Sequence, residues 1–256
     1  MKSAFYLPLV VLLIAAFFMT PAIADPSSHP TKTTVFNDEI ECAACGEKVE
    51  VTLIGSTNTM GYSDLDMRPA EMQRSTMPMW IQYCPHCGYC ASSLNFLIDG
   101  AGDVIDSEEY KTQLENENYP EIANHFLCSA MIYENAEEYL NAAWHTVYAA
   151  WACDDSGNDN AAVCRMQAVE LFETSMDRDE DFGTNLVDFC ILTDLLRRSG
   201  EFHRAIDSAT EALDSDMEDD ICEAILEFQI ELALDEDSEC YTVGDIPNVD
   251  ELFKEN

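Results

Sequence analysis

Hydrophobic residues recur at helical spacing through the second half of the chain. The apolar positions from Leu140 to Trp151 fall on one face of a helix, because they repeat with the period of the α-helix. The same periodicity predicts further helices over residues 161–174, 186–198, 201–213 and 219–234. The sequence therefore predicts a mainly α fold, with its helical domain at residues 106–235.

Two polar positions are suited to begin helices in this region. Ser107 precedes Glu108, and serine is a preferred residue immediately before a helix. Asn135 and Glu138 have the spacing of a capping box, in which each side chain satisfies a backbone N–H of the other residue. We expect helices to start at both places.

One helical hairpin follows the pattern of a tetratricopeptide repeat. From Gly200 to Leu213, small alanines line one face after Phe202, as in the second helix of that repeat. Residues 139–175 are a looser copy, and residues 219–234 resemble part of a third. Because stacked repeats bury their faces on one another, the end repeats need caps, and residues 107–133 can provide one. We predict a tetratricopeptide-like α-hairpin array.

The first third of the chain has a different pattern. Residues 48–54 alternate and are rich in β-branched side chains, which predicts a strand, and a second short apolar run covers residues 79–83. We expect a small β module at residues 36–98. A leader rich in Pro, Ser and Thr precedes it at residues 25–35. An irregular acidic tail is expected at residues 236–256.

The N-terminus has the features of a secretory signal peptide. Lys2 is followed by an apolar run to Met19, and small residues flank Ile23 before a cleavage point after Ala24. The apolar run is short for a membrane span and Pro8 interrupts it. We expect residues 1–24 to be removed, giving a periplasmic or secreted protein without stable membrane insertion.

The charge of the chain is strongly negative and unevenly distributed. The formal net charge is −38, and 41 of the 50 acidic residues lie after Ile98. Such a surface repels nucleic acid and anionic membranes, because it lacks the cations that neutralise phosphates. A protein or peptide partner, if charged, should be cationic.

Two Cys-x-x-Cys pairs provide the most specific chemistry of the sequence. Each pair presents two sulfurs on one side of a turn, and a glycine follows each pair, at Gly46 and Gly88. Two such turns suit a tetrahedral metal, and zinc is the usual occupant. The 38 residues between the pairs exceed the common zinc-ribbon spacing. The sequence predicts a zinc-ribbon-like module holding structural Zn²⁺ through Cys42, Cys45, Cys84 and Cys87.

Other uses of these cysteines remain open. Cys84-Pro85-His86-Cys87 is the active-site tetrapeptide of periplasmic thiol oxidants of the thioredoxin fold, although Gly88 disfavours the helix that would lower the pKa of Cys84. The two pairs can also form two disulfides. Cys90 extends the second pair towards an iron–sulfur motif, but Leu94 stands where a further cysteine is expected. Cys90 is also a candidate replacement zinc ligand.

The remaining cysteines and a few charged residues have less specific interpretations. Seven of the 11 cysteines lie outside the two pairs, so at least one is free or intermolecular, and their connectivity cannot be deduced: Cys90, Cys128, Cys153, Cys164, Cys190, Cys222 and Cys240. His125 with Cys128 is a possible ligand pair, but core packing is the simpler interpretation. Asp64 and Asp66 are expected to cap turns, and Arg197 and Arg198 to pair with carboxylates.

Together these motifs resemble a bacterial family catalogued as domain of unknown function 2225. The resemblance covers about residues 42–213, and it rests on both cysteine pairs, on the segment from Asp64 to Pro69, and on helical signatures such as Leu195 to Phe202. It implies a zinc-ribbon-like N-terminus followed by tetratricopeptide-like helices, and it implies no established activity. The signal peptide, the acidity and the additional cysteines depart from the family pattern.

The sequence favours an exported, non-enzymatic, zinc-binding scaffold that presents a concave helical surface to a partner. A thiol–disulfide oxidoreductase that uses Cys84 and Cys87 is the alternative, and a purely disulfide-stapled secreted protein is a third possibility.

Overall fold

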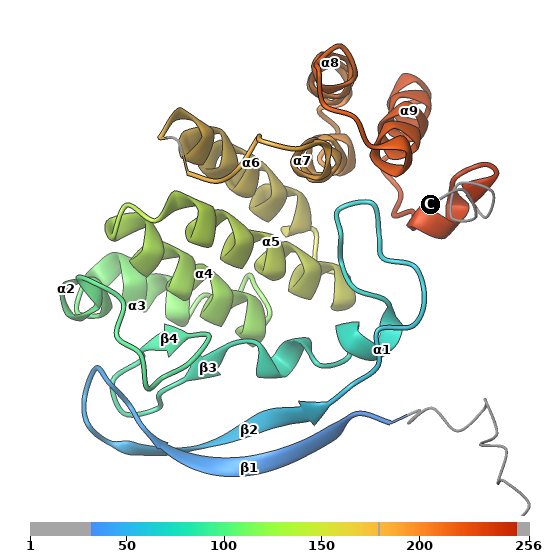
Figure 1. Ribbon diagram of the computed structural model, residues 1–256. Helices are drawn as coiled ribbons and strands as arrows, with labels where there is room; N and C mark the ends of the chain where they lie inside the picture. The colour runs from blue at the N-terminus through green and yellow to red at the C-terminus, as the bar shows by residue number, and fades with distance from the viewer. Residues whose placement is uncertain (1–31, 179, 250–256) are drawn as a thin grey trace, which may run out of the picture. The chain divides into compact units, whose positions relative to one another are not determined.

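The computed structural model describes residues 32–178 and 180–249 of the 256-residue chain. This part is mainly helical, with small two-stranded sheets towards its N-terminal end, as the hydrophobic pattern predicts (Figure 1). The predicted signal peptide and most of the leader lie outside the described residues, as does the end of the predicted acidic tail. None of the helices in the described ranges has the length and apolarity needed to cross a membrane.

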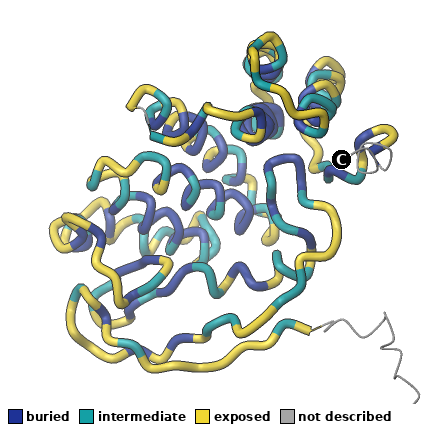
Figure 2. The backbone as a smooth tube through the Cα atoms, viewed as in Figure 1, coloured by how far each residue is buried: buried dark blue, intermediate teal, exposed yellow. Residues whose placement is uncertain are grey.

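A long β-ribbon opens the described chain. Strands β1 (Thr34–Glu41) and β2 (Lys48–Ser56) pair antiparallel, with Glu41 opposite Lys48 at the turn. The alternation predicted for residues 48–54 is confirmed from Lys48 to Thr52, because Val49 and Val51 are buried while Lys48, Glu50 and Thr52 are exposed. β1 is exposed along nearly all of its length (Figure 2).

A second, much shorter hairpin follows the ribbon. It consists of β3 (Gln82–Tyr83) and β4 (Cys90–Ala91), which pair antiparallel. The chain between the two hairpins contains helix α1 (Glu71–Arg74) and the 3-10 helix η1 (Met77–Met79). Each cysteine pair therefore lies in the turn of a β-hairpin.

The rest of the chain is built from helices joined by short turns. They are α2 (Ala101–Ile105), α3 (Glu108–Leu114), α4 (Glu121–Asn135), α5 (Tyr139–Asp155), α6 (Ala161–Asp177), α7 (Leu186–Arg198), α8 (Phe202–Leu213) and α9 (Asp220–Leu234), with a 3-10 helix η2 (Val243–Asp245). The predicted cap at Ser107 is confirmed, since its hydroxyl accepts the N–H of Tyr110. Hairpins α5–α6 and α7–α8 lie where the sequence predicts them; the tetratricopeptide-like arrangement itself stays a prediction.

The capping box predicted at Asn135 and Glu138 is wrong. Asn135 ends α4, and α5 begins at Tyr139 without a side-chain cap from Glu138. The carboxylate of Glu180 accepts the N–H groups of Tyr139 and Leu140 at 3.2 and 2.6 Å instead. A residue that follows α6 thus supplies the acceptor that the local sequence was expected to supply.

The β-hairpins and the helices share one hydrophobic core. Buried residues of the ribbon and of β4 belong to the same cluster as the inner faces of α4, α5 and α6 (Figure 2). Tyr89, between the second cysteine pair and β4, is fully buried there. The β module and the helical domain expected from the sequence therefore share one core, which continues across residues 99–105 between them.

The segment from Asp64 to Pro69, here called the anchor loop, is buried against the helices. Leu65 is fully buried and packs with residues of α7, α8 and α9 in a second core cluster. The N–H of Leu65 donates to the carbonyl of Tyr241, and Asp64 forms a β-bridge with Thr242. The chain after α9 therefore packs on the anchor loop up to Val249, within the region expected to be an irregular tail.

Buried charges hold the anchor loop in place. The Asp66 carboxylate accepts the indole N–H of Trp151 on α5 at 2.7 Å and the backbone N–H of Arg68 at 3.1 Å. Arg198 on α7 lies 3.5 Å from the same carboxylate and 2.9 Å from Asp154. The predicted turn-capping role of Asp66 and the predicted pairing of Arg198 are confirmed, and both contribute to one network.

Candidate metal centre

The four predicted ligands come from two turns of the same construction. Cys42 follows β1 and Cys84 follows β3, and the second cysteine of each pair lies within the turn. The N–H of Gly46 donates to the carbonyl of Cys42 at 2.7 Å, and the N–H of Gly88 donates to that of Cys84 at 2.8 Å. The backbones of the two turns therefore have the same hydrogen-bonding pattern.

The glycine after each pair has the backbone conformation that the knuckle requires. Gly46 has φ +77° and Gly88 has φ +82°, in the left-handed region where other residues are strained. The glycine that follows each pair in the sequence therefore relieves backbone strain in both turns.

Backbone N–H groups point at the first sulfur of each knuckle. The thiol of Cys42 accepts hydrogen bonds from the N–H groups of Cys45 and Ala44, and that of Cys84 from those of Cys87 and His86. Burial raises the pKa of both thiols, and the pKa of Cys42 stays raised. The pKa of Cys84 is lowered, because hydrogen bonds from the side chains of Cys87 and Cys42 add to those from the backbone. Donors of this kind orient and stabilise metal-bound thiolates.

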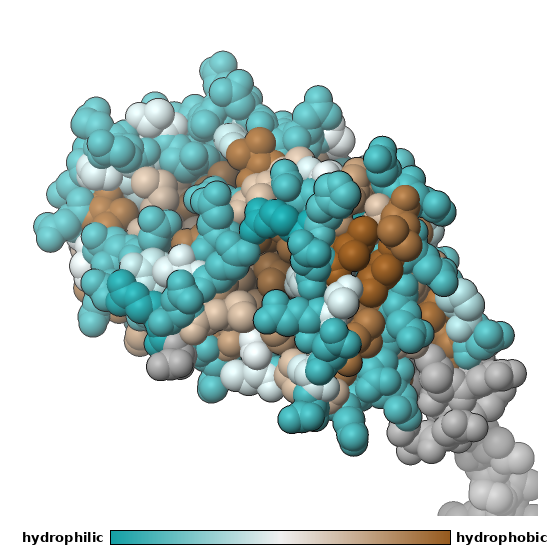
Figure 3. Space-filling model, turned by 90° about the horizontal axis from the view of Figure 1, so that it is seen from above, coloured by the Kyte–Doolittle hydropathy of each residue, from teal (hydrophilic) through white to brown (hydrophobic). Residues whose placement is uncertain are grey.

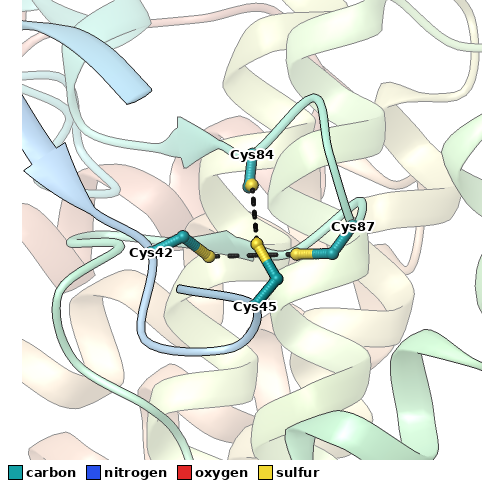
Figure 4. A group of neighbouring side chains, drawn as sticks. All are labelled: Cys42, Cys45, Cys84 and Cys87. Carbon is teal, nitrogen blue, oxygen red and sulfur yellow. Dashed lines mark hydrogen bonds between the residues drawn. The ribbon is translucent and has the colours of Figure 1, made fainter. Parts of the chain in front are cut away.

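The four sulfur atoms have the spacing of a tetrahedral metal site. The Sγ atoms of Cys42 and Cys87 lie 3.8 Å apart and those of Cys45 and Cys84 lie 3.7 Å apart (Figure 4). All four lie within 4.8 Å of one another. A tetrahedron with metal–sulfur bonds of about 2.3 Å has edges of about 3.8 Å. The four predicted residues can therefore hold a metal ion.

Contacts from outside the knuckles fix their positions. The N–H of Ala43 donates to the carbonyl of Leu94 at 2.7 Å, and the hydroxyl of Tyr110 on α3 donates to the carbonyl of Gly88 at 2.9 Å. This role of Tyr110 could not be predicted from the sequence, because the contact joins residues 22 positions apart and leaves no local pattern. Leu94, which stands where an iron–sulfur motif needs cysteine, thus supports the first knuckle through its backbone.

The geometry argues against two of the other uses considered for these cysteines, the thioredoxin-type active site and the iron–sulfur motif. Cys84 begins a turn between two strands rather than a helix, which removes the basis of a thioredoxin-type active site. Cys90 lies outside the four-sulfur cluster, is fully buried, and donates its thiol to the carbonyl of Gly88 at 3.5 Å. It is therefore not placed to replace a ligand of the cluster or to act as the third cysteine of an iron–sulfur motif.

The remaining candidate residues have structural partners. The ring of His125 stacks on Tyr83 with centroids 4.5 Å apart, and burial lowers the pKa of His125. Asp64 pairs with Arg74, and Arg197 pairs with Asp194. In the described part of the chain, the four-cysteine cluster is the only group of three or more His, Cys, Asp or Glu side chains placed to bind a metal ion.

Comparison with known proteins gives no relative of this chain. No family model, curated protein or solved structure matches the chain. The resemblance to the family of unknown function stays a prediction.

Proposed function

We propose that the chain is an exported, non-enzymatic protein in which Zn²⁺ has a structural role and the acidic surface binds a cationic protein or peptide. The observation that carries the proposal is the closed set of four protein sulfurs at the spacing of a tetrahedron. Structural zinc sites have four protein ligands, whereas catalytic sites keep one position for water or substrate. A site with four thiolates offers no such position.

Zinc bound here would join two hairpins that form separate sheets. One knuckle belongs to the β-ribbon and the other to the short hairpin that packs on α4. The two hairpins are separate two-stranded sheets, and an isolated two-stranded sheet is marginally stable. Metal bonds between the knuckles would hold the ribbon against the helical part.

The surface supports a polar partner rather than an apolar one. On the face seen in Figure 3 most side chains are hydrophilic, and the hydrophobic groups lie in small patches between them. The anchor loop already packs against α7, α8 and α9. A partner would therefore meet the acidic surface of the chain after Ile98, where 41 of the 50 acidic residues lie.

The proposal is tested on protein exported from cells and purified without reductant. We expect its N-terminus at Asp25, and we expect no catalysis of insulin reduction by dithiothreitol beyond that of a Cys87→Ser control. Rapid insulin reduction that depends on Cys87 would instead establish the oxidoreductase. A chain that keeps Met1 would contradict export.

Partner chemistry is tested separately with defined peptides. A Lys- and Arg-rich peptide should bind in calorimetry, with an affinity that falls as the salt concentration rises. The same peptide with glutamate in place of each cation is the control. Equal binding of both peptides, or binding of neither, would contradict the acidic surface as a binding surface.

A further inference from the structure

The outer edge of β1 has no partner strand among the described residues. β1 pairs with β2 alone, and the ribbon is a two-stranded sheet. In Figure 1, β2 lies between β1 and the helices. Every residue of β1 except Ile40 is exposed. The strand therefore presents an edge of eight residues to solvent, whereas proteins usually shorten or cover such edges.

The hydrogen-bonding register of the ribbon shows which backbone groups point outward. The N–H of Cys42 donates to the carbonyl of Glu47 at 2.9 Å, immediately beyond the paired residues of the two strands. In an antiparallel pair, residues that exchange hydrogen bonds alternate with residues whose N–H and C=O groups point away from the partner. The N–H of Glu39 follows this alternation, because it donates to the carboxylate of Asp38 at 2.9 Å rather than to β2. The outward groups of β1 therefore belong to its odd-numbered residues, Val35, Asn37, Glu39 and Glu41.

The edge is held extended before any peptide binds. β2 is anchored by Val49 and Val51, which are buried in the main core, and β1 is paired with β2 along its whole length. A hydrogen bond of 2.7 Å between the hydroxyls of Thr34 and Ser56 closes the open end of the ribbon. A strand that is already ordered loses less conformational entropy when it binds a partner.

The side chains of β1 are acidic in the half that leads to the metal centre and apolar in the other half. Val35 and Phe36, in the apolar half, are 51% and 52% exposed. Residues 34–56 contain five carboxylates and one lysine, so the ribbon has a formal net charge of −4. A strand that matches this edge has cations at one end and apolar side chains at the other. The three carboxylates of β1 itself are Asp38, Glu39 and Glu41.

A second copy of the chain does not match the edge. Antiparallel pairing of two β1 strands through all of their outward groups centres on residue 38, which places two Asp38 side chains opposite each other. Like charges directly opposite each other destabilise a strand pair, and each ribbon is itself acidic. The carboxylates therefore oppose self-association, as charges on edge strands commonly do, but they attract a cationic strand.

We propose that the edge of β1 binds an extended cationic peptide as a third, antiparallel strand of the ribbon. Backbone hydrogen bonds to the four outward residues give the affinity, and cations opposite Asp38 and Glu41 give the selectivity. The antiparallel direction is the more stable one per residue. The inference goes beyond the proposed function, because this edge precedes Ile98 and is separate from the acidic surface that follows it.

The test is calorimetry of the purified, zinc-loaded protein with a designed peptide, Lys-Val-Lys-Lys-Thr-Tyr-Val-Thr. Antiparallel pairing places its lysines opposite the three carboxylates of β1 and its last apolar residues opposite Val35 and Phe36. Two derivatives differ only in which three backbone nitrogens are methylated. Methylation of the third, fifth and seventh residues blocks N–H groups that face β1, and methylation of the second, fourth and sixth blocks N–H groups that face away.

The position of the methyl groups should decide binding. The unmodified peptide and the peptide methylated on its outer edge should bind, whereas methylation of the inner edge should weaken binding at least about tenfold, because three hydrogen bonds are lost. Equal binding of both methylated peptides would overturn the inference and leave charge-driven binding to the acidic surface standing. If the Lys- and Arg-rich peptide of the proposed function binds and none of these three does, this inference alone is overturned.

Hydrogen exchange followed by nuclear magnetic resonance locates the bound peptide. Binding should slow exchange of the outward N–H groups of Asn37 and Glu41, while those of Phe36 and Asp38, which already face β2, should change little. Protection confined to the helices would overturn the inference.

Charge reversal separates the edge from the rest of the acidic surface. Asp38→Lys combined with Glu41→Lys should weaken binding of the unmodified peptide about tenfold. Asp207→Lys combined with Glu211→Lys, at two exposed positions of α8, is the matched control and should weaken it less than about twofold. If circular dichroism shows that the first variant is unfolded, replacing the lysines of the peptide by glutamate should abolish binding to the wild-type protein. Equal effects of the two double variants, or binding of the glutamate peptide, would contradict the proposal.

Discussion

Replacing Asp66 by alanine should detach the anchor loop from the helices. The substitution leaves the buried indole N–H of Trp151, now 2.7 Å from the Asp66 carboxylate, without an acceptor. A buried donor without a partner costs about 1–3 kcal/mol. Arg198 loses one of its two carboxylates but keeps Asp154 at 2.9 Å, so the full cost of an unpaired buried charge does not apply. We expect the free energy of unfolding to fall by about 3 kcal/mol, from these losses together.

The assay is guanidinium unfolding followed by circular dichroism at fixed zinc concentration. Trp151→Phe removes the donor, so the double variant with Asp66→Ala should be more stable than the sum of the single effects predicts, with a coupling of about 1.5–3 kcal/mol. The exposed Asp207→Ala is the matched control and should change stability by less than about 0.5 kcal/mol. A cost below about 1 kcal/mol for Asp66→Ala, or an absent coupling, would refute the anchoring role of the carboxylate.

Three further substitutions test separate parts of the structure. Gly46→Ala should cost about 1–2 kcal/mol, because the left-handed backbone strains any residue other than glycine. Gly88→Ala (φ +82°) should cost more, because its new Cβ would also lie 3.2 Å from Leu114. Equal effects of the two variants in denaturant unfolding would contradict this. Glu180→Ala should lower the free energy of unfolding by about 1 kcal/mol, because the first N–H groups of α5 lose their acceptor, and Glu138→Ala should change it by close to nothing. A larger effect of Glu138→Ala than of Glu180→Ala would instead support the capping box predicted from the local sequence. Burial lowers the pKa of His145 from 6.5 to about 4, so between these pH values the unfolded chain binds more protons than the folded chain. The free energy of unfolding should therefore fall by up to about 3 kcal/mol as the pH falls from 6.5 to about 4. His145→Gln should remove this part of the pH dependence, and an unchanged dependence would contradict the reasoning.

The parts of the structure that depend on local pattern could be predicted from the sequence. The helices lie within a few residues of their predicted ranges, and the cap at Ser107 was found, because periodicity and capping act between neighbours. The knuckles were found for the same reason, since each needs only two cysteines and a glycine within five positions.

The remaining parts depend on contacts between distant residues. Trp151 was predicted on the apolar face of its helix, but the hydrogen bond from its indole to Asp66, 85 positions away, was not. The cap of α5 comes from Glu180, about 40 positions away, and neither contact leaves a periodic signal.

Metal content of the mature protein tests the central claim most directly. Protein purified without reductant or chelator would be analysed for zinc and iron, and its thiolates would be titrated with a mercurial while the released metal is followed. We predict about one zinc per chain, released as four thiolates react, and none in Cys84→Ser. Protein that contains no metal, with Cys42, Cys45, Cys84 and Cys87 joined as disulfides, would contradict the account.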